Sequence, residues 1–389
     1  MLTQLQIHHV RNLQQVTLQD LSRINIFFGA NGSGKTSVLE SVHMLGMARS
    51  FRQGATRTLI QHGQRDCTVY GMTADTGTGS ASRVPVAVQR TLTGEVQIKL
   101  GGQTIRSVAE LVEHLPLQVL NAASFELLTG APAARRQFLN WGVFHVEQRF
   151  FAEWQRFQRC LKQRNKLLRH GKLDHSELSV WTRDLAKSGE RIHEFRLQYF
   201  EALAPRFRTM MEQLSPSLGG LELRYRKGWD RSLNFSEALA ASVQADTDQG
   251  YTHTGPQRAD IKVTASGHSA AETLSRGQQK LVVCGLKLAQ GQLMSQKRQG
   301  SCVYLVDDLP AELDARHCGL VCDALAGLQA QVFITCVAKA DLEHMWPAGL
   351  KPALFHVERG AVVELRESEE TPVPGQEGPD LVTGFMPLP

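Results

Sequence analysis

Two short stretches decide the fold of this chain: Gly29-Ala30-Asn31-Gly32-Ser33-Gly34-Lys35-Thr36 and, much later, Leu274-Ser275-Arg276-Gly277-Gln278-Gln279-Lys280. The first matches the pattern GxxxxGK[ST]. It lies between an apolar run, Ile24 to Phe28, and a stretch with helical spacing, Ser37 to Leu45. Strand, glycine-rich loop and helix, in that order, are the context that a phosphate-binding loop needs. This stretch therefore predicts a site for a nucleoside triphosphate.

The residue types of the loop indicate how the phosphates would be held. Backbone N–H groups close on the phosphates, Lys35 reaches the β- and γ-phosphates, and Thr36 offers its hydroxyl to Mg²⁺. We therefore expect Mg²⁺ and ATP as cofactors. The expected ATP contacts in this part of the chain are Gly29, Ala30, Asn31, Gly32, Ser33, Gly34, Lys35, Thr36 and Ser37.

A second apolar run, Val303 to Val306, is predicted to be a buried strand and ends in Asp307-Asp308. Two adjacent acids at a strand end can divide the work: Asp307 holds Mg²⁺, and Asp308 orients or deprotonates the attacking water. The alternative is a solvated Asp-Asp turn. Lys35, Asp307 and Asp308 are the predicted catalytic residues.

The later stretch predicts the N-terminus of a helix that continues to about Gln290. Free N–H groups and the positive end of the helix dipole suit a phosphate oxygen there. By itself the pattern SxGQ is also typical of a helix cap. Its place shortly before the Asp307-Asp308 strand favours nucleotide contacts from Ser275, Arg276, Gly277 and Gln278.

Composition narrows the class of protein. The chain has 389 residues, 42% of them hydrophobic and 21% charged. It has no apolar run long enough to span a bilayer and no leader pattern, so we expect a cytoplasmic protein without a membrane partner. Seven cysteines without a CxxC pair are expected to be reduced core residues. A net charge of +5 permits a polyanionic partner.

The predicted fold class is α/β, a discontinuous head made of residues 1–146 and 206–366. Short strands from about 67 to 106 predict a flanking antiparallel sheet. Apolar residues at helical spacing predict an inserted antiparallel pair of helices at 147–205, each about 35 to 40 Å long, with a turn at 170–176. The acidic, proline-containing segment 367–389 has the composition of a disordered tail.

The first helix of this arm is strongly basic, which is typical of backbone contacts with DNA but also of an ordinary solvated face. No recognition helix or aromatic-interleaved strand predicts base-specific readout. The predicted DNA contacts are Arg156, Arg159, Lys162, Arg164 and Lys166, followed by Arg135 and Arg136, and then Arg49 and Arg52.

Together these motifs resemble the ABC-type ATPase head of the SMC proteins and, more narrowly, the RecF family of bacterial recombination and gap repair. Matching stretches cover nearly the whole chain to about residue 365. Besides the motifs above, they include His9 to Leu13, Ala48 to Arg52, Arg135 to Trp141, Leu161 to Asn165 and Glu312 to Asp314. The resemblance implies that Ser275 closes on the nucleotide of a second copy, so that ATP joins a homodimer.

The resemblance also implies roles for four further residues. Gln118 would link Mg²⁺ to the arm, Thr335 would sense the γ-phosphate, and Arg11 and Asn12 would approach the nucleotide. Gln118 and, more so, Thr335 are also typical of ordinary strand-end polar residues, and Arg11 can form a simple surface salt bridge. The chain departs from the family's usual His-Gly-Pro-His, because Thr254 and Gln257 replace the two histidines.

By this resemblance the chain is expected to be an ATP-dependent DNA-binding protein of recombinational repair, replication-fork recovery and the SOS response to DNA damage. It would clamp DNA at single-strand gaps or duplex junctions and help RecA load, with RecR and RecO as partners. Slow, DNA-stimulated ATP hydrolysis would release the DNA. The alternative is an ABC-type ATPase that acts on a protein partner in transport or defence without DNA. A P-loop kinase is a weaker alternative.

Overall fold

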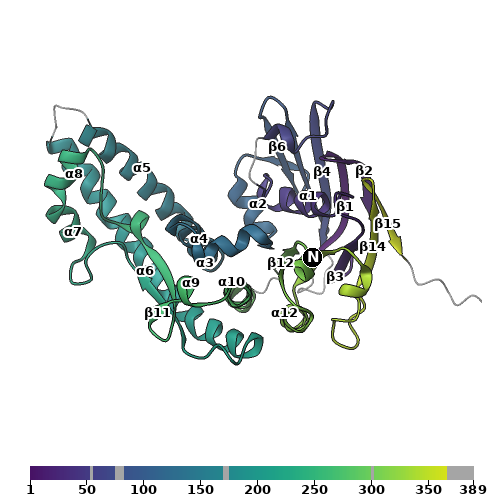
Figure 1. Cartoon of the computed structure of the whole chain (residues 1–389). Coiled ribbons are helices and arrows are strands. Elements are labelled where there is room, and N and C mark those ends of the chain that lie inside the picture. Colours follow the sequence, from purple (N-terminus) through teal and green to yellow (C-terminus); the bar gives the residue numbers. More distant parts are fainter. Residues whose placement is uncertain (53–55, 75–82, 170–174, 299–301, 366–389) are drawn as a thin grey trace, which may run out of the picture.

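The computed structural model describes residues 1–52, 56–74, 83–169, 175–298 and 302–365. Figure 1 shows a head built from sheets and, beside it, a largely helical lobe. The expected tail at 367–389 and most of the expected turn at 170–176 lie outside the described residues.

A six-stranded sheet lies at the centre of the head, in the order β15-β14-β3-β13-β12-β8. The strands from β14 to β8 are mutually parallel, and β15 pairs antiparallel at the edge. Their bounds are β3 Ile24–Phe28, β8 Leu117–Leu120, β12 Val303–Val306, β13 Gln331–Cys336, β14 Ala353–Glu358 and β15 Ala361–Leu365.

Successive side chains of these strands point alternately into two separate hydrophobic cores. Leu305 and Phe333 face one core, while Val306 and Ile334, their neighbours along the chain, face the other. Because successive side chains in a strand point to opposite faces, a strand buried on both sides is mostly apolar. The expected strand at 303–306 is therefore apolar throughout, whereas the strand at 24–28 has one buried polar residue, Asn25, which bonds to Ser22 and to the carbonyl of Val332.

The first core lies between this sheet and an antiparallel sheet, in the order β2-β1-β4-β5-β6-β7. Helix α1, Lys35–Met47, contributes Val38 and Val42 to the same core. The strand bounds are β1 Leu2–Val10, β2 Leu13–Leu18, β4 Asp66–Ala74, β5 Arg83–Thr91, β6 Val96–Leu100 and β7 Gln103–Ile105. The flanking antiparallel sheet expected at 67–106 is confirmed.

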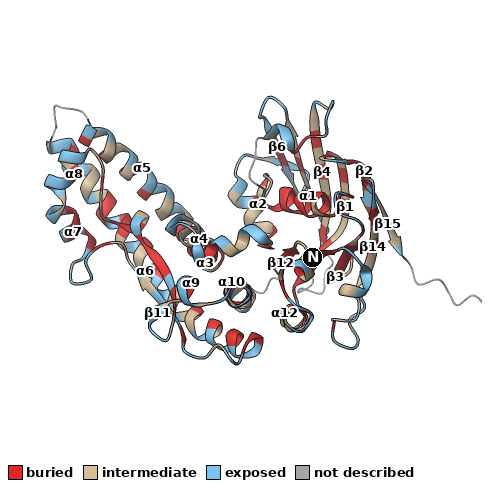
Figure 2. Ribbon diagram, viewed as in Figure 1, coloured by how far each residue is buried: buried red, intermediate tan, exposed pale blue. Residues whose placement is uncertain are grey.

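The second core joins the opposite face of the central sheet to the helical lobe, and the buried residues of Figure 2 continue from one lobe into the other. The helix bounds are α2 Val108–His114, α3 Glu126–Thr129, α4 Pro132–Val146, α5 Phe150–Arg169, α6 His175–Leu214, α7 Phe235–Ala241, α8 Val243–Gln249, α9 Ala270–Thr273, α10 Arg276–Arg298, α11 Leu309–Glu312 and α12 Ala315–Gly327. A third sheet, in the order β11-β10-β9, comprises β9 Leu221–Arg226, β10 Asp260–Ala265 and β11 His268–Ser269.

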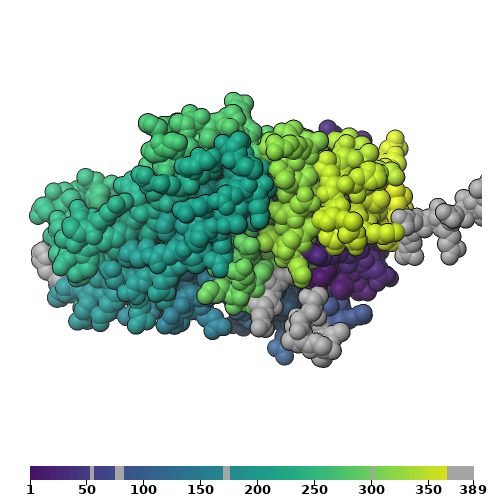
Figure 3. Space-filling model, turned by 90° about the horizontal axis from the view of Figure 1, so that it is seen from below, coloured from purple at the N-terminus to yellow at the C-terminus, as the bar shows by residue number. Residues whose placement is uncertain are grey.

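The arm differs from its expected dimensions. Helix α6 has 40 residues and continues through Pro205 to Leu214, so the expected boundary at residue 205 falls inside a helix. Its length is about 60 Å at 1.5 Å per residue. Helices α7 and α8 and the third sheet pack against the two arm helices. In Figure 3, residues 150–270 therefore appear as one continuous mass.

All seven cysteines are buried and unpaired, as the sequence predicts. Within the described residues, no helix is both long and apolar enough to cross a membrane.

Candidate nucleotide site

The glycine-rich loop lies between the end of β3 and the start of α1. Gly29, Gly32 and Gly34 have φ values of 147°, 79° and 122°, which L side chains rarely adopt. A Cβ at Gly29 would also meet the carbonyl oxygen of Val357 at 2.2 Å. The loop can therefore turn tightly around an anion only because glycine occupies these positions.

Lys35 is 7% exposed, and its Nζ donates to the carbonyl oxygens of Gly29 at 2.7 Å and Ala30 at 3.0 Å. These bonds hold the ammonium group inside the curve of the loop. A phosphate cradled by the loop would thus meet a positive charge as well as backbone N–H groups.

Asp307 is the centre of the polar cluster at the carboxyl edge of the sheet. Thr36 Oγ1 and Thr335 Oγ1 each donate to Asp307 Oδ1 at 2.9 Å. The backbone N–H of Asp308 donates in turn to Thr335 Oγ1 at 2.8 Å. These residues meet because β12 and β13 are parallel neighbours with Val306 paired to Ile334, so the next residue of each strand lies at the same edge.

The donor set fits a magnesium ion. A hydroxyl from Thr36 and a carboxylate from Asp307 are the hard oxygen ligands that Mg²⁺ takes, usually together with phosphate oxygens and water. No cluster of three or more histidine, cysteine or acidic side chains suited to a metal exists among the described residues. The fit is thus to a magnesium ion that arrives with phosphates, and not to an all-protein cage.

Asp308 occupies the left-handed region, with φ 54°, immediately before α11. Partial burial, followed by the like charge of Asp307, raises the pKa of the Asp308 carboxyl above its ordinary value. A raised pKa suits a group that accepts a proton from water. Asp308 lines the same cavity as Lys35 and Thr36.

This cavity has a volume of about 680 Å³ and is bordered by the loop, the Asp307 cluster and the turn between β1 and β2. At that turn, Asn12 accepts a hydrogen bond from Ser37 Oγ at 2.9 Å, and its Nδ2 donates to the carbonyl of Ser33 at 3.0 Å. Asn12 therefore braces the phosphate loop. Arg11 also lines the cavity.

The guanidinium of Arg11 is engaged by a residue that sequence reasoning missed. Its Nε and Nη2 bond to the two carboxylate oxygens of Glu40 at 3.0 and 2.8 Å. Glu40 is 0% exposed and also accepts from Ser50 Oγ at 2.5 Å. The sequence feature that could have pointed to Glu40 is its position as a charged residue within the otherwise largely apolar helix α1. Arg11 thus forms a salt bridge, but with a buried carboxylate of the phosphate-loop helix.

The signature stretch lies elsewhere. Ser275 and Gln278 cap α10: the Ser275 N–H donates to Gln278 Oε1 at 2.9 Å, and Ser275 Oγ accepts from the Gln278 N–H at 3.4 Å. Ser275, Arg276 and Gly277 are exposed, and none of them lines the nucleotide cavity. Farther along α10, Lys280 pairs with Glu312 at 2.5 Å.

Gln118 is not near the nucleotide cavity. It lies within β8, 5% exposed, and its Nε2 donates to Gln290 Oε1 at 2.7 Å inside the second core. The expectation that Gln118 contacts Mg²⁺ is therefore corrected. The residue after β8 is Asn121, which lies beside Asp307 because the Asp307 N–H donates to the carbonyl of Leu120 at 2.8 Å. Strand register, which the sequence does not reveal, puts Gln118 inside the sheet, three residues before Asn121, which follows the end of the strand.

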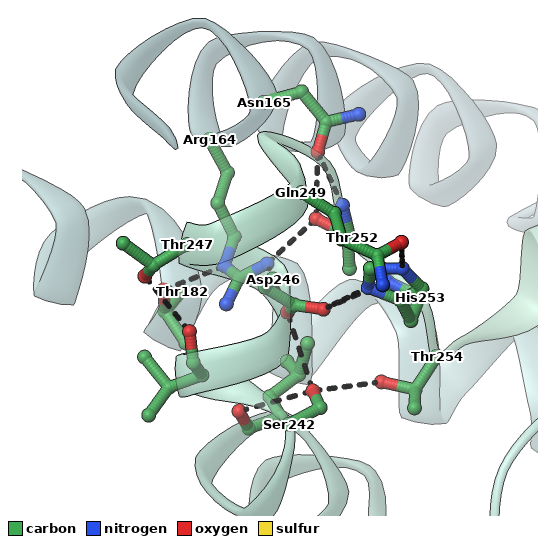
Figure 4. Close-up of polar contacts among 12 residues, drawn as sticks. Arg164, Asn165, Thr182, Ser242, Asp246, Thr247, Gln249, Thr252, His253 and Thr254 are labelled. Carbon is green, nitrogen blue, oxygen red and sulfur yellow. Dashed lines mark hydrogen bonds and ion pairs between the residues drawn. The ribbon is translucent and has the colours of Figure 1, made fainter. Parts of the chain in front are cut away.

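Three of the predicted DNA contacts are structural. Arg164 is 0% exposed, and Figure 4 shows it within a polar cluster in which its Nη1 pairs with Asp246 at 2.8 Å. Arg135 makes a bidentate ion pair with Asp260 at 2.7 and 3.2 Å. Arg136 donates to the carbonyl of Ala259 at 3.1 Å, and burial lowers the pKa of its guanidinium.

The other predicted DNA contacts remain available to solvent. Arg159, Lys162 and Lys166 are exposed on α5, and Arg156, also exposed, pairs with Asp184 at 3.2 Å. Since burying a charge is costly unless it is paired, Arg164 and Arg135, which pair with carboxylates, serve the fold. The exposed cations of α5 are better placed to neutralise phosphates.

Comparison with known proteins agrees with this geometry. The RecF/RecN/SMC N terminal domain family matches residues 1–355. The chain is 50% identical over 369 residues to the DNA replication and repair protein RecF of Pseudomonas syringae pv. syringae, covering 95% of this chain and 100% of the relative. The corresponding RecF of Pseudomonas fluorescens Pf-5 is 50% identical over 370 residues, with the same coverage.

Among solved structures, the recombination mediator protein RecF with ATP superimposes with a TM-score of 0.80 at 24% identity, covering 94% of this chain and 97% of that one. The Smc head domain of Pyrococcus furiosus superimposes with a TM-score of 0.58 at 14% identity, covering 94% and 96%. At these identities the structures support the fold, and the sequence relatives identify the branch. The chain belongs to the RecF family, with the ABC-type ATPase head that this family shares with the SMC proteins.

Proposed function

We propose that the chain is an ATP-dependent DNA-binding protein of DNA replication and recombinational repair, in which Mg·ATP joins two copies. One observation carries this proposal: the site is divided. Lys35, Thr36 and Asp307 surround one cavity, whereas Ser275 lies exposed at the start of α10 and outside it. A second copy can supply the missing half, because an exposed helix N-terminus offers free N–H groups to a phosphate.

Within each site the side chains divide the chemistry. Thr36 and Asp307 would hold Mg²⁺, which neutralises charge on the phosphates as they react. Asn12 and Lys35 position the loop, and Thr335 fixes Asp307 and the backbone of Asp308. Asp308 accepts the proton of the attacking water. Aspartate is a shorter base than glutamate, so the ATPase is weak unless the two copies close tightly.

DNA is held through its backbone on the exposed cations. On the arm these are Arg159, Lys162 and Lys166. A cleft of about 1350 Å³ reaches the start of the same helix, α5, at Trp154, and the exposed Arg49 and Arg106 line it. The names of the sequence relatives favour DNA over a purely protein partner. Family membership supports the further proposal that the protein acts at single-strand gaps and in RecA loading, with RecR and RecO as partners.

The test is molecular mass in solution, by light scattering, with and without Mg·ATP. Wild type is expected to dimerise with Mg·ATP, and the Lys35→Arg and Ser275→Arg variants to stay monomeric. A mixture of the two variants assembles one intact site from two defective chains, so it recovers part of the dimer and of the ATPase. Ser232→Arg, at another exposed serine, is the matched control.

A wild type that remains monomeric with Mg·ATP contradicts the dimer. A mixture no more active than either variant contradicts the divided site. DNA binding that is equally strong without nucleotide and at high salt contradicts the clamp, since backbone contacts lose affinity steeply with salt.

A further inference from the structure

A groove of about 760 Å³ lies on the arm, and none of its lining residues borders the nucleotide cavity. Helix α6 lines it from Leu178 to Glu190, and the start of α7 and α8 line it from Asn234 to Val243. Arg164 of α5 also borders it. A volume of this size is within the range of about 300 to 1,000 Å³ typical of ligand sites.

Arg164 borders this groove, and one nitrogen of its buried guanidinium has no partner. Its Nε donates to Thr182 Oγ1 at 3.1 Å, and its Nη1 bonds to Asp246 at 2.8 Å and Thr252 at 2.6 Å. Its Nη2 has no hydrogen-bond partner among the described residues, although the side chain is 0% exposed. Buried guanidinium N–H groups are costly to leave unpaired, so this nitrogen is suited to an incoming acceptor.

The nearby carboxylates do not satisfy Arg164 Nη2. One oxygen of Asp246 accepts from Arg164 Nη1, and the other accepts from the backbone and the ring of His253, as Figure 4 shows. Glu190, the one acidic side chain among the groove's described lining residues, accepts from the N–H of Phe235 at 2.8 Å. Arg164 is balanced by Asp246, so the net positive charge of the groove comes from Arg183 and Lys187, which outnumber Glu190.

The entrance adds further charge and the walls are apolar. Arg183 and Lys187 are exposed on the α6 side. Leu178 and Leu239 form buried wall, and Val243 is 42% exposed. A ligand that fits must present an anionic oxygen together with apolar surface.

We propose that this groove binds an acidic, partly apolar peptide segment of a partner protein, with a carboxylate accepting from Arg164 Nη2 and an adjacent apolar side chain covering Leu239 and Val243. A carboxylate with guanidinium is the favoured charge-assisted pair. A DNA backbone fits less well, because it has no apolar group to cover the walls and cannot enter as deeply as a single side chain. This docking site is separate from the proposed ATP and DNA functions.

The test uses the full chain and fluorescence anisotropy of two labelled peptides, one of alternating glutamate and leucine and one of alternating glutamine and leucine. The acidic peptide is expected to bind at least about tenfold more tightly, because charged hydrogen bonds are the stronger ones. Lys187→Glu should weaken binding about three- to tenfold. Arg208→Glu, an exposed arginine of the same helix that does not line the groove, should leave binding unchanged.

Ala240→Trp changes no charge and fills the groove from its exposed edge. It should abolish peptide binding while ATP affinity and the thermal melt stay as in wild type. Equal affinity for the two peptides, no binding by wild type, or wild-type binding by Ala240→Trp would overturn the proposal. If duplex DNA displaces the peptide and Ala240→Trp weakens DNA binding equally, the groove is a DNA site and the peptide proposal is wrong.

Discussion

Replacing Thr335 by valine should remove two hydrogen bonds that hold Asp307 and the backbone of Asp308 in place. Valine has nearly the shape of threonine but lacks the hydroxyl that donates to Asp307 Oδ1 at 2.9 Å and accepts from the Asp308 N–H at 2.8 Å. The bond to the carboxylate is worth about 1.5 to 3 kcal/mol, and the backbone bond about 1 kcal/mol. Asp307 is only half-buried, so water compensates in part. The free energy of unfolding should fall by about 2 to 3 kcal/mol.

Thr335→Ser is the matched control, because it keeps the hydroxyl and loses one methyl group, at a cost of about 1 kcal/mol. Urea unfolding followed by tryptophan fluorescence measures both variants. Mg·ATP affinity, measured with a fluorescent ATP analogue, should fall about tenfold for valine and little for serine, since groups that orient a metal ligand typically matter to that degree. A valine variant within about 0.5 kcal/mol of wild type, or a serine variant less stable than valine, would refute the reasoning.

Four further outcomes, from three variants, can be measured. The pKa of the Asp308 carboxyl is raised above 3.8 in the folded protein, so its ionisation destabilises the folded state as pH rises. In urea unfolding, Asp308→Asn should therefore be more stable than wild type at pH 7. This difference in the free energy of unfolding should vanish below about pH 4, where the carboxyl is protonated in both states. The same variant should slow dissociation of the ATP dimer, and equal dissociation rates would remove Asp308 as the base. Lys162→Glu with Lys166→Glu should lower DNA affinity and reduce the slope of log affinity against log salt by about 2, whereas an unchanged slope moves the DNA site elsewhere. Arg164→Met should leave that salt slope unchanged but lower the free energy of unfolding by about 3 to 5 kcal/mol, because it strands the buried Asp246 carboxylate.

The sequence by itself determined the candidate nucleotide site around the phosphate loop. The residues from Gly29 to Thr36 are contiguous, so a strand, a tight turn and a helix suffice to bring their donors together. The same holds for Asp307 and Asp308, which end an apolar strand. In both cases the functional groups are close together because they are neighbours along the chain. The order of the motifs, which resembles that of the family, indicates how the strands and helices between them follow one another.

Only the tertiary structure decided which polar residues are available for function. Arg164 appeared to belong with Lys162 and Lys166, but it lies on the buried face of α5 with Phe157 and Leu168, and its partner Asp246 follows 82 residues later. Gln118 likewise finds Gln290 172 residues away. Since burying a charge or an amide is tolerated only with a partner, distant pairing decides whether such a residue supports the fold or faces a ligand. Helical spacing alone puts Arg164 on the face of Phe157 and Leu168, but no local pattern identifies Asp246 or Gln290 as the partner.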